Sequence, residues 1–272
     1  MIAFAANSIL CRLALQKPLI DAASFGSIRL VSGALTLALI VRWMQRDGKR
    51  TKTDWLAAAM LFLYVACFSF AYLSLSAGTG ALILFGAVQF TMFVVGLHAG
   101  ETFRPLSWTG LALAALGLVY LVSPGLSAPA PLGAGLMAVA GIAWGIYSLR
   151  GRGVTDPLCA TAGNFRRAVP FALLVSLLFH AGFHAAPAGV ALAVVSGAVT
   201  SAVGYVIWYA AMRGLSATRA ATVQLSVPVI AALGGALLLS EPLTLRLVLS
   251  SVATLGGIAL VLSQRAARKR PA

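Results

Sequence analysis

The sequence predicts an all-α, polytopic membrane protein with ten transmembrane helices arranged as two five-helix repeats of opposite orientation. Three observations lead to this prediction. Of the 272 residues, 60% are hydrophobic and only 10% are charged, whereas soluble domains are roughly 45–50% apolar and about 25% charged. The apolar residues form ten stretches near the length of about 20 residues that a membrane-crossing helix needs. An offset of 140 residues aligns the two halves of the chain without a gap.

The first five stretches are separated by short connections rich in charged residues, Pro, Gly or Ser, which typically end helices. The first stretch opens at Met1 and is short for a full crossing. The second ends at a basic cluster over 42–52, and only residues 76–78 separate the third from the fourth. So short a connection makes neighbouring helices antiparallel. The predicted spans are Met1–Leu15, Ala22–Trp43, Trp55–Leu75, Thr79–Ala99 and Ser107–Val122.

The second five stretches follow a linker over 123–131. Arg150 and Arg152 separate the sixth from the seventh, and residues 240–242 separate the ninth from the tenth. The predicted spans are Leu132–Leu149, Ala160–Phe183, Gly189–Met212, Ala217–Leu239 and Leu243–Leu262.

The 140-residue offset predicts the domain organisation. It places Glu101 on Glu241, a match that carries weight because the chain has only six acidic residues. Since five spans is an odd number, the second half enters the membrane the other way up, and inverted repeats of this kind recur in transporters. We therefore expect a first repeat over 1–122 with a shortened first helix, an inverted second repeat over 132–263, and a basic cytoplasmic tail over 264–272.

The distribution of charge predicts the orientation. The net charge is +14. With both termini in the cytoplasm, fourteen Lys and Arg residues fall on cytoplasmic connections or the tail, and only Lys17 and Arg246 on outer connections. The positive-inside rule favours this orientation over its reverse. We read the basic tail as a topology signal rather than a site for lipid or nucleic acid, and expect a multi-pass protein of the bacterial plasma (inner) membrane.

Several short motifs resemble a known family. A stretch over 4–7 is followed by Arg12, and a similar one over 144–147 is followed by Arg150; Phe25 and Arg29 form a Phe-x-x-x-Arg pattern. Together with Glu101 and Glu241 after the fourth and ninth spans, these motifs resemble the EamA-type ten-span exporters of the drug/metabolite transporter superfamily over nearly the whole length. The chain departs from that pattern at Phe4, where the family usually has Trp. The resemblance implies transport of a small metabolite or drug, usually outward.

Charged side chains within apolar spans are the first site candidates, because an ionisable group inside a membrane costs about 2.5–3.5 kcal/mol on insertion scales. Arg29 lies about two turns into the second span, away from either basic loop. It would recognise an anion in a cavity, or else act as a snorkelling or inter-helix structural Arg. Arg12 is a similar candidate nearer the outer surface. Glu101 and Glu241 lie at span ends, where we expect a structural role rather than proton coupling.

Uncharged groups extend the candidate substrate-binding set. Buried polar side chains need hydrogen-bond partners, so those within spans either contact substrate or tie helices together. Aromatic side chains would line a cavity for amphipathic solutes, or else form an interfacial belt. The polar candidates are Asn7, Ser8, Gln89 and Gln224, and the aromatic candidates are Trp144, Tyr147, Tyr205 and Trp208.

These observations favour a secondary transporter that exports a small metabolite, amino-acid-like or amphipathic compound by alternating access. The alternatives are a membrane-embedded enzyme, which would need a cluster of catalytic side chains at one depth, and a non-transporting membrane scaffold. The sequence carries no enzyme, cofactor or metal motif, so we expect no catalytic residue, no cofactor and no metal. The expected partners are the substrate and the lipid bilayer, with a monomer and a homodimer both open.

Overall fold

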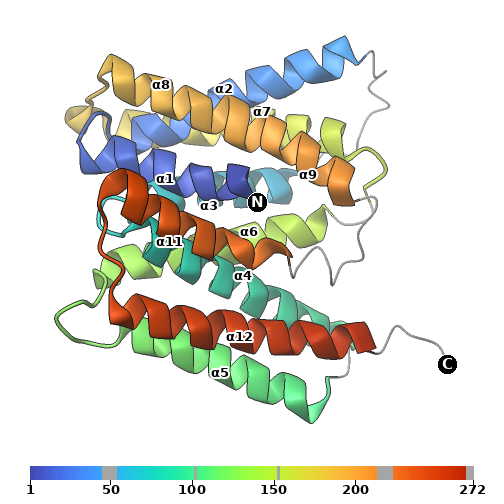
Figure 1. Cartoon of the computed structure of the whole chain (residues 1–272). Coiled ribbons are helices and arrows are strands. Elements are labelled where there is room, and N and C mark those ends of the chain that lie inside the picture. Colours follow the sequence, from blue (N-terminus) through green and yellow to red (C-terminus); the bar gives the residue numbers. More distant parts are fainter. Residues whose placement is uncertain (45–53, 101–102, 152–153, 213–222, 268–272) are drawn as a thin grey trace.

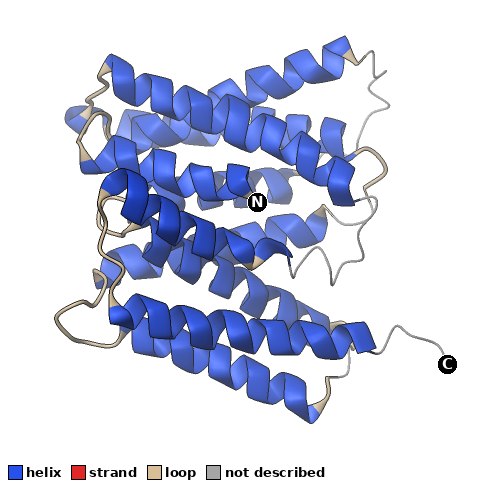
Figure 2. Cartoon of the chain, viewed as in Figure 1, coloured by secondary structure: helices blue, strands red, loops and turns tan. Residues whose placement is uncertain are grey.

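The computed structural model describes residues 1–44, 54–100, 103–151, 154–212 and 223–267. Within those ranges the chain is a bundle of helices without a named strand, as Figure 2 shows. The first half holds α1 (Ile2–Gln16), α2 (Ala22–Trp43), α3 (Trp55–Ala71), α4 (Ala77–His98) and α5 (Pro105–Val122). The second half holds α6 (Pro131–Arg150), α7 (Pro157–Leu178), the short η1 (His180–Gly182), α8 (Pro187–Val195), η2 (Ser196–Val203), α9 (Gly204–Met212), α11 (Ser226–Leu239) and α12 (Leu245–Ala267).

The helices begin where local chemistry favours a helix start. The side chains of Asp21, Asp54, Ser76 and Asp156 each accept a hydrogen bond from a backbone N–H in the first turn of α2, α3, α4 and α7. These acceptors satisfy donors that an α-helix leaves unpaired. Helices α5, α6 and α8 begin on a proline instead, and α7 has both its Asp156 cap and a proline. Proline is favoured at the first helical position.

The predicted fold class is confirmed: the chain is an all-α polytopic membrane protein. Six helices of the described chain are long and apolar enough to cross a membrane, counting α8, η2 and α9 as one, and α1, α3 and α11 are shorter apolar helices. Their outer surfaces expose many large apolar side chains, as expected where lipid is the solvent. The number of crossings stays a prediction.

Two helices end four or five residues earlier than predicted. Helix α3 ends at Ala71 rather than Leu75, because the backbone turns at Tyr72, Leu73 and Ser74. Helix α7 ends at Leu178 rather than Phe183, because the chain then turns and pairs with the α1–α2 connection through Ala185 and Ile20. Helix α11 (Ser226–Leu239) ends where the ninth span was predicted to end, and residues 217–222 of that span lie outside the described residues.

Consecutive long helices run in opposite directions, and their connections lie at the two ends of the bundle (Figure 1). We call the end with the α1–α2 connection the Asp21 end and the end at which α3 begins the Asp54 end. Helix α12 packs along α5, α2 along α7, and α3 along α6, while α4 lies against α6 and α11. Helix α1 lies between α11, α4 and the α8–η2 segment.

Small residues permit the most extensive helix contact of the described chain, that of α5 with α12. A Cβ atom on Gly257 would stand 2.7 Å from the backbone nitrogen of Ala114, and one on Gly117 would stand 2.9 Å from the backbone nitrogen of Thr254. Such separations leave no room for a side chain. Close backbone approach through small residues is a general basis of helix association in membranes.

Each end of the bundle is tied by polar contacts. At the Asp21 end, Ile20 and Ala185 form an isolated antiparallel bridge, and the Asp21 N–H donates to the His184 carbonyl at 2.8 Å. At the Asp54 end, Arg150 Nε donates to Asp54 Oδ2 at 2.7 Å. Burial works to raise the pKa of Asp54, but hydrogen bonds from Arg150 and from the backbone outweigh it and hold that pKa below its ordinary value.

Candidate functional site

Arg29, on α2, is the largest fully buried side chain of the described chain, with 1% of its surface exposed. Its Nε donates to the Ser201 hydroxyl at 3.1 Å, and its Nη2 donates to the Tyr64 hydroxyl at 3.0 Å. The guanidinium carbon lies 5.2 Å from the centre of the Tyr64 ring and 4.9 Å from that of Phe68. Helices α2, α3 and η2 thus meet around one cation.

The Arg29 charge is incompletely satisfied. Nη1 is buried and has no hydrogen-bond partner. Among the described residues the carboxylates lie elsewhere: Asp21, Asp54 and Asp156 cap helix starts, and Glu241 pairs with Arg12. Aromatic faces attract a cation, with estimates of about 0.5–2 kcal/mol. Such contacts are far weaker than the desolvation cost of a buried ion, which an anion normally offsets.

Asn7, on α1, extends the polar cluster. Its Oδ1 accepts hydrogen bonds from Ser196 (2.7 Å), Thr200 and Ser201 (3.5 Å). All four side chains are buried. Ser201 therefore links Asn7 to Arg29.

The η2 segment has the wide turns of a π-helix, which explains how one oxygen reaches three hydroxyls. In an α-helix, residues i and i+4 share a face but i+5 is turned away, whereas the wider turn of a π-helix, which bonds i to i+5, keeps i+4 and i+5 both near the face of residue i. Ser196, Thr200 and Ser201 can then face one atom together. Such wide turns occur frequently at functional sites.

Glycine lets η2 approach α2. A Cβ atom on Gly197 would stand 2.9 Å from the Arg29 carbonyl carbon and would overlap the Ser32 hydroxyl. Because no side chain separates the two backbones, Ser201 comes within hydrogen-bond distance of the guanidinium.

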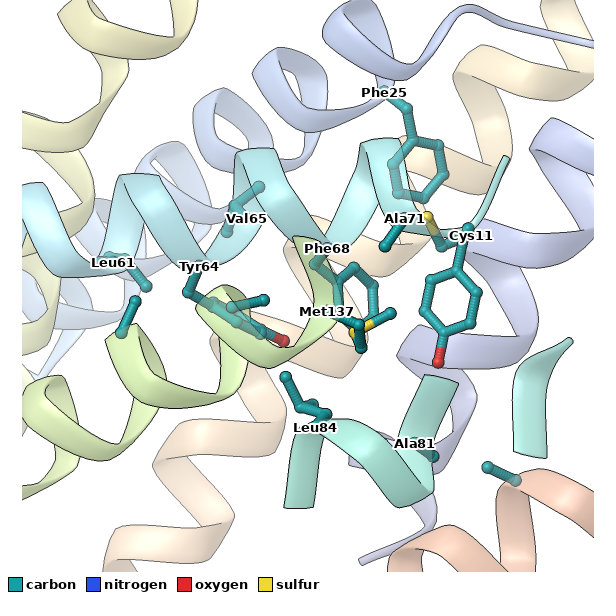
Figure 3. Packing of buried hydrophobic residues seen from close by; sticks show 14 of the residues in the cluster. Cys11, Phe25, Leu61, Tyr64, Val65, Phe68, Ala71, Ala81, Leu84 and Met137 are labelled. Carbon is teal, nitrogen blue, oxygen red and sulfur yellow. The ribbon is translucent and has the colours of Figure 1, made fainter. Parts of the chain in front are cut away.

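Aromatic rings surround the cluster. Phe4 contacts Trp144, Tyr205 and Trp208, with ring centres 6.3, 5.8 and 6.0 Å away. Trp144 also lies 4.9 Å from the Tyr64 ring and 5.3 Å from the Tyr205 ring. Figure 3 shows Tyr64 and Phe68 on α3, next to Met137 of α6 and near Cys11 of α1. The rings thus join α1, α3, α6 and α9 beside Arg29.

Several predicted candidates meet here. The structure brings together Arg29, Asn7, Trp144, Tyr205 and Trp208, and Tyr147 packs on Trp144 with ring centres 5.4 Å apart. Six further residues of the site were not among the site residues predicted from the sequence: Phe4, Tyr64, Phe68, Ser196, Thr200 and Ser201. Three hydroxyls within six residues of an apolar span were a signal for the last three.

Arg12 has a different place from Arg29. Its Nε lies 3.0 Å from Glu241 Oε1, and its Nη1 donates to the Tyr72 carbonyl at 3.0 Å. The other Glu241 oxygen accepts the Ala77 N–H at 2.8 Å, at the start of α4. We call Arg12, Tyr72, Ala77 and Glu241 the Glu241 cluster; it ties α1, α4 and the end of α11 at the Asp21 end.

The remaining candidates stand apart from Arg29. Ser8 is buried beside Tyr72. Among the described residues, no hydrogen bond joins Gln89 or Gln224 to Arg29, although Gln89 Nε2 is buried without a partner. Glu101, predicted to be structural, lies outside the described residues.

Known proteins resemble the chain in sequence and fold. Residues 131–263 match the model of the EamA-like transporter family. An uncharacterized protein of Pseudomonas aeruginosa is 52% identical over 268 residues, covering 98% of this chain and 93% of its own length. An uncharacterized transporter of Archaeoglobus fulgidus is 28% identical over 196 residues, 70% of each chain. A crystal structure that is 18% identical has a TM-score of 0.68 over 97% of both chains, which shows a shared fold.

Proposed function

Because the chain belongs to the EamA-like transporter family, we propose that it is a secondary transporter that exports a small metabolite, amino-acid-like or amphipathic compound across the plasma membrane by alternating access. One observation carries the proposal: the buried Arg29 cation, which lacks a carboxylate partner among the described residues, is contacted by Tyr64 from the first half of the chain and Ser201 from the second. Ionisable groups inside membranes mark substrate or ion pathways.

The packing supports two inverted repeats. Helix α1 packs on α11 and the α8–η2 segment of the second half, and α6 packs on α4 and α3 of the first. In a five-helix repeat, α6 corresponds to α1, α4 to α11, and α3 to the α8–η2–α9 helix, so the two sets of neighbours are equivalent. Each repeat thereby inserts its first helix into the other half. Transporters of this architecture place the substrate between the halves, which rock about it.

The contacts at the Asp21 end support alternating access in a state closed at that end. There the Glu241 cluster and the pairing of Ile20 with Ala185 join the halves. At the Asp54 end the halves are joined by the Arg150–Asp54 pair, whose side chains are 43% and 27% exposed. We propose that the Asp21 end faces outward and that substrate approaches Arg29 from the cytoplasmic side.

A comparison of exported solutes tests the function. We expect a strain that overproduces the protein to accumulate at least one small compound in the medium, and a deletion strain to retain it. The measurement is a mass-spectrometric profile of medium and cells, followed by flux of the compound in proteoliposomes. A protein that moved none of the differing compounds in proteoliposomes would contradict the transporter proposal.

A pair of reporter fusions tests the orientation. Alkaline phosphatase fused after Ala272 should be inactive and green fluorescent protein at the same site fluorescent, because the predicted cytoplasmic connections carry the basic residues. Phosphatase inserted between Gly182 and Phe183, at the Asp21 end, should be active. The reverse activities would overturn the proposed orientation.

A further inference from the structure

We infer, on the basis of the proposed function, that the Arg29 site takes a small organic monoanion: a carboxylate attached to a flat apolar body, and not a zwitterion or a cation. The inference rests on the donors that Arg29 leaves unused, on the charges around it and on the rings beside it.

The unused donors fit a carboxylate. A guanidinium has five N–H groups in one plane. Ser201 takes the Nε hydrogen and Tyr64 takes one from Nη2, while Nη1 has no partner. The hydrogens left on Nη1 and Nη2 suit the two oxygens of a carboxylate, which arginine commonly binds through two parallel hydrogen bonds.

The charge balance selects an overall monoanion. Bound to Arg29, a carboxylate would make a neutral pair in a site that excludes water. A zwitterion would bring a positive charge into the same site, and the described residues offer no carboxylate near Arg29 to receive it. An unpaired buried charge costs several kcal/mol or more, so an ammonium group should weaken binding, and a cation without a carboxylate should bind worst.

The rings beside Arg29 select an apolar and flat body. Tyr64 and Phe68 already cover the guanidinium, and the Trp144 ring continues this surface 4.9 Å from Tyr64. Tyr64, Phe68 and Tyr205 are buried, whereas Phe4 and Trp144 are only half-buried. The apolar surface that is still exposed therefore lies on the side of Phe4, where a flat body could stack.

Four indole compounds of nearly one shape separate these classes. At neutral pH indole-3-acetate is an anion, tryptophan a zwitterion, tryptamine a cation, and indole-3-acetamide neutral. We expect indole-3-acetate to bind the purified full chain in lipid nanodiscs at least about tenfold more tightly than any of the other three, measured by titration calorimetry. A tenfold difference corresponds to about 1.4 kcal/mol.

Two variants test whether the preference for the anion depends on Arg29. Arg29→Gln should bind indole-3-acetate and indole-3-acetamide equally, because the charge is lost while hydrogen-bond donors remain. Tyr64→Phe should keep the preference for the anion, because the ring stays in place and another N–H of Arg29 becomes available. If a variant fails to fold, the comparison of the four compounds on the wild-type protein still tests the inference.

The outcomes distinguish this inference from the transporter proposal. If tryptophan or tryptamine binds as tightly as indole-3-acetate, or if none of the four binds, the monoanion inference is overturned while transport of another solute remains measurable. If indole-3-acetate binds through Arg29 but no flux follows in proteoliposomes, the monoanion inference stands and the transporter proposal fails.

Discussion

Arg29→Ala is expected to lower substrate affinity about 10- to 100-fold without preventing membrane insertion. A hydrogen bond to a charged group contributes about 1.5–3 kcal/mol, and each 1.4 kcal/mol is about tenfold in affinity. Because no carboxylate of the described residues depends on Arg29 for its charge balance, the substitution should also remove an unfavourable buried charge. The measurement is initial flux in proteoliposomes as a function of substrate concentration, with the melting temperature recorded in parallel.

Two control variants accompany that measurement. Arg29→Lys keeps the charge but loses the planar fork of donors, and should retain intermediate affinity. Arg246→Ala removes an arginine that binds the Leu121 and Ser123 carbonyls at the Asp21 end, and should leave affinity unchanged. Unchanged transport in Arg29→Ala would remove Arg29 from the site, and a collapse of the fold would assign it a structural role.

Glu241→Ala is expected to have the largest effect on stability, lowering the free energy of unfolding by about 2–4 kcal/mol. Removing one partner of a buried ion pair typically costs about 3–5 kcal/mol, since the other charge is left buried. The range here is lower because the Arg12 and Glu241 side chains keep 16% and 9% of their surface exposed. The same change leaves the Ala77 N–H without its acceptor.

Thermal unfolding in detergent measures this loss, and a double variant separates its causes. Glu241→Gln keeps an acceptor oxygen for Ala77 and should lose less stability than Glu241→Ala. Arg12→Met combined with Glu241→Met should be less destabilised than the two single changes added together, because no charge then stays buried alone.

A native cysteine reports whether the Asp21 end opens. Cys11 precedes Arg12 and is fully buried. In a chain carrying Cys67→Ser and Cys159→Ser, Glu241→Ala should raise the labelling of Cys11 by a membrane-impermeant maleimide added from outside. Unchanged labelling and an unchanged unfolding temperature would show that the Glu241 cluster does not close this end.

The fold could be predicted largely because its signals are local. The predicted second span, Ala22–Trp43, coincides with α2, since an Asp21 cap precedes it and a basic cluster follows. The early ends of α3 and α7 could not be predicted, because they depend on contacts made across the bundle. Tyr72 lies in the turn held by Arg12, and His184 pairs with Asp21, 163 residues earlier.

The site was harder to predict for the same reason. Arg12 and Arg29 look alike in the sequence, each a single cation in an apolar helix. Only the fold shows that Arg12 meets Glu241, 229 residues away, while Arg29 meets aromatic rings and hydroxyls. The aromatic candidates Trp144 and Tyr205 could be predicted from the sequence because the chain has only five Trp and six Tyr residues.

The wide turns of η2 also determine the direction in which the side chains of α9 point around the helix axis. Successive residues of an α-helix are turned by about 100° about the helix axis. If η2 became a regular α-helix and thereby lost its extra residue, Tyr205 and Trp208 would rotate by roughly that angle relative to Ser196. The hydroxyls that hold Asn7 and the rings that contact Phe4 would then point in different directions. The position of the wide turns within the helix from Pro187 to Met212 therefore decides whether its polar and its aromatic residues face the same part of the bundle.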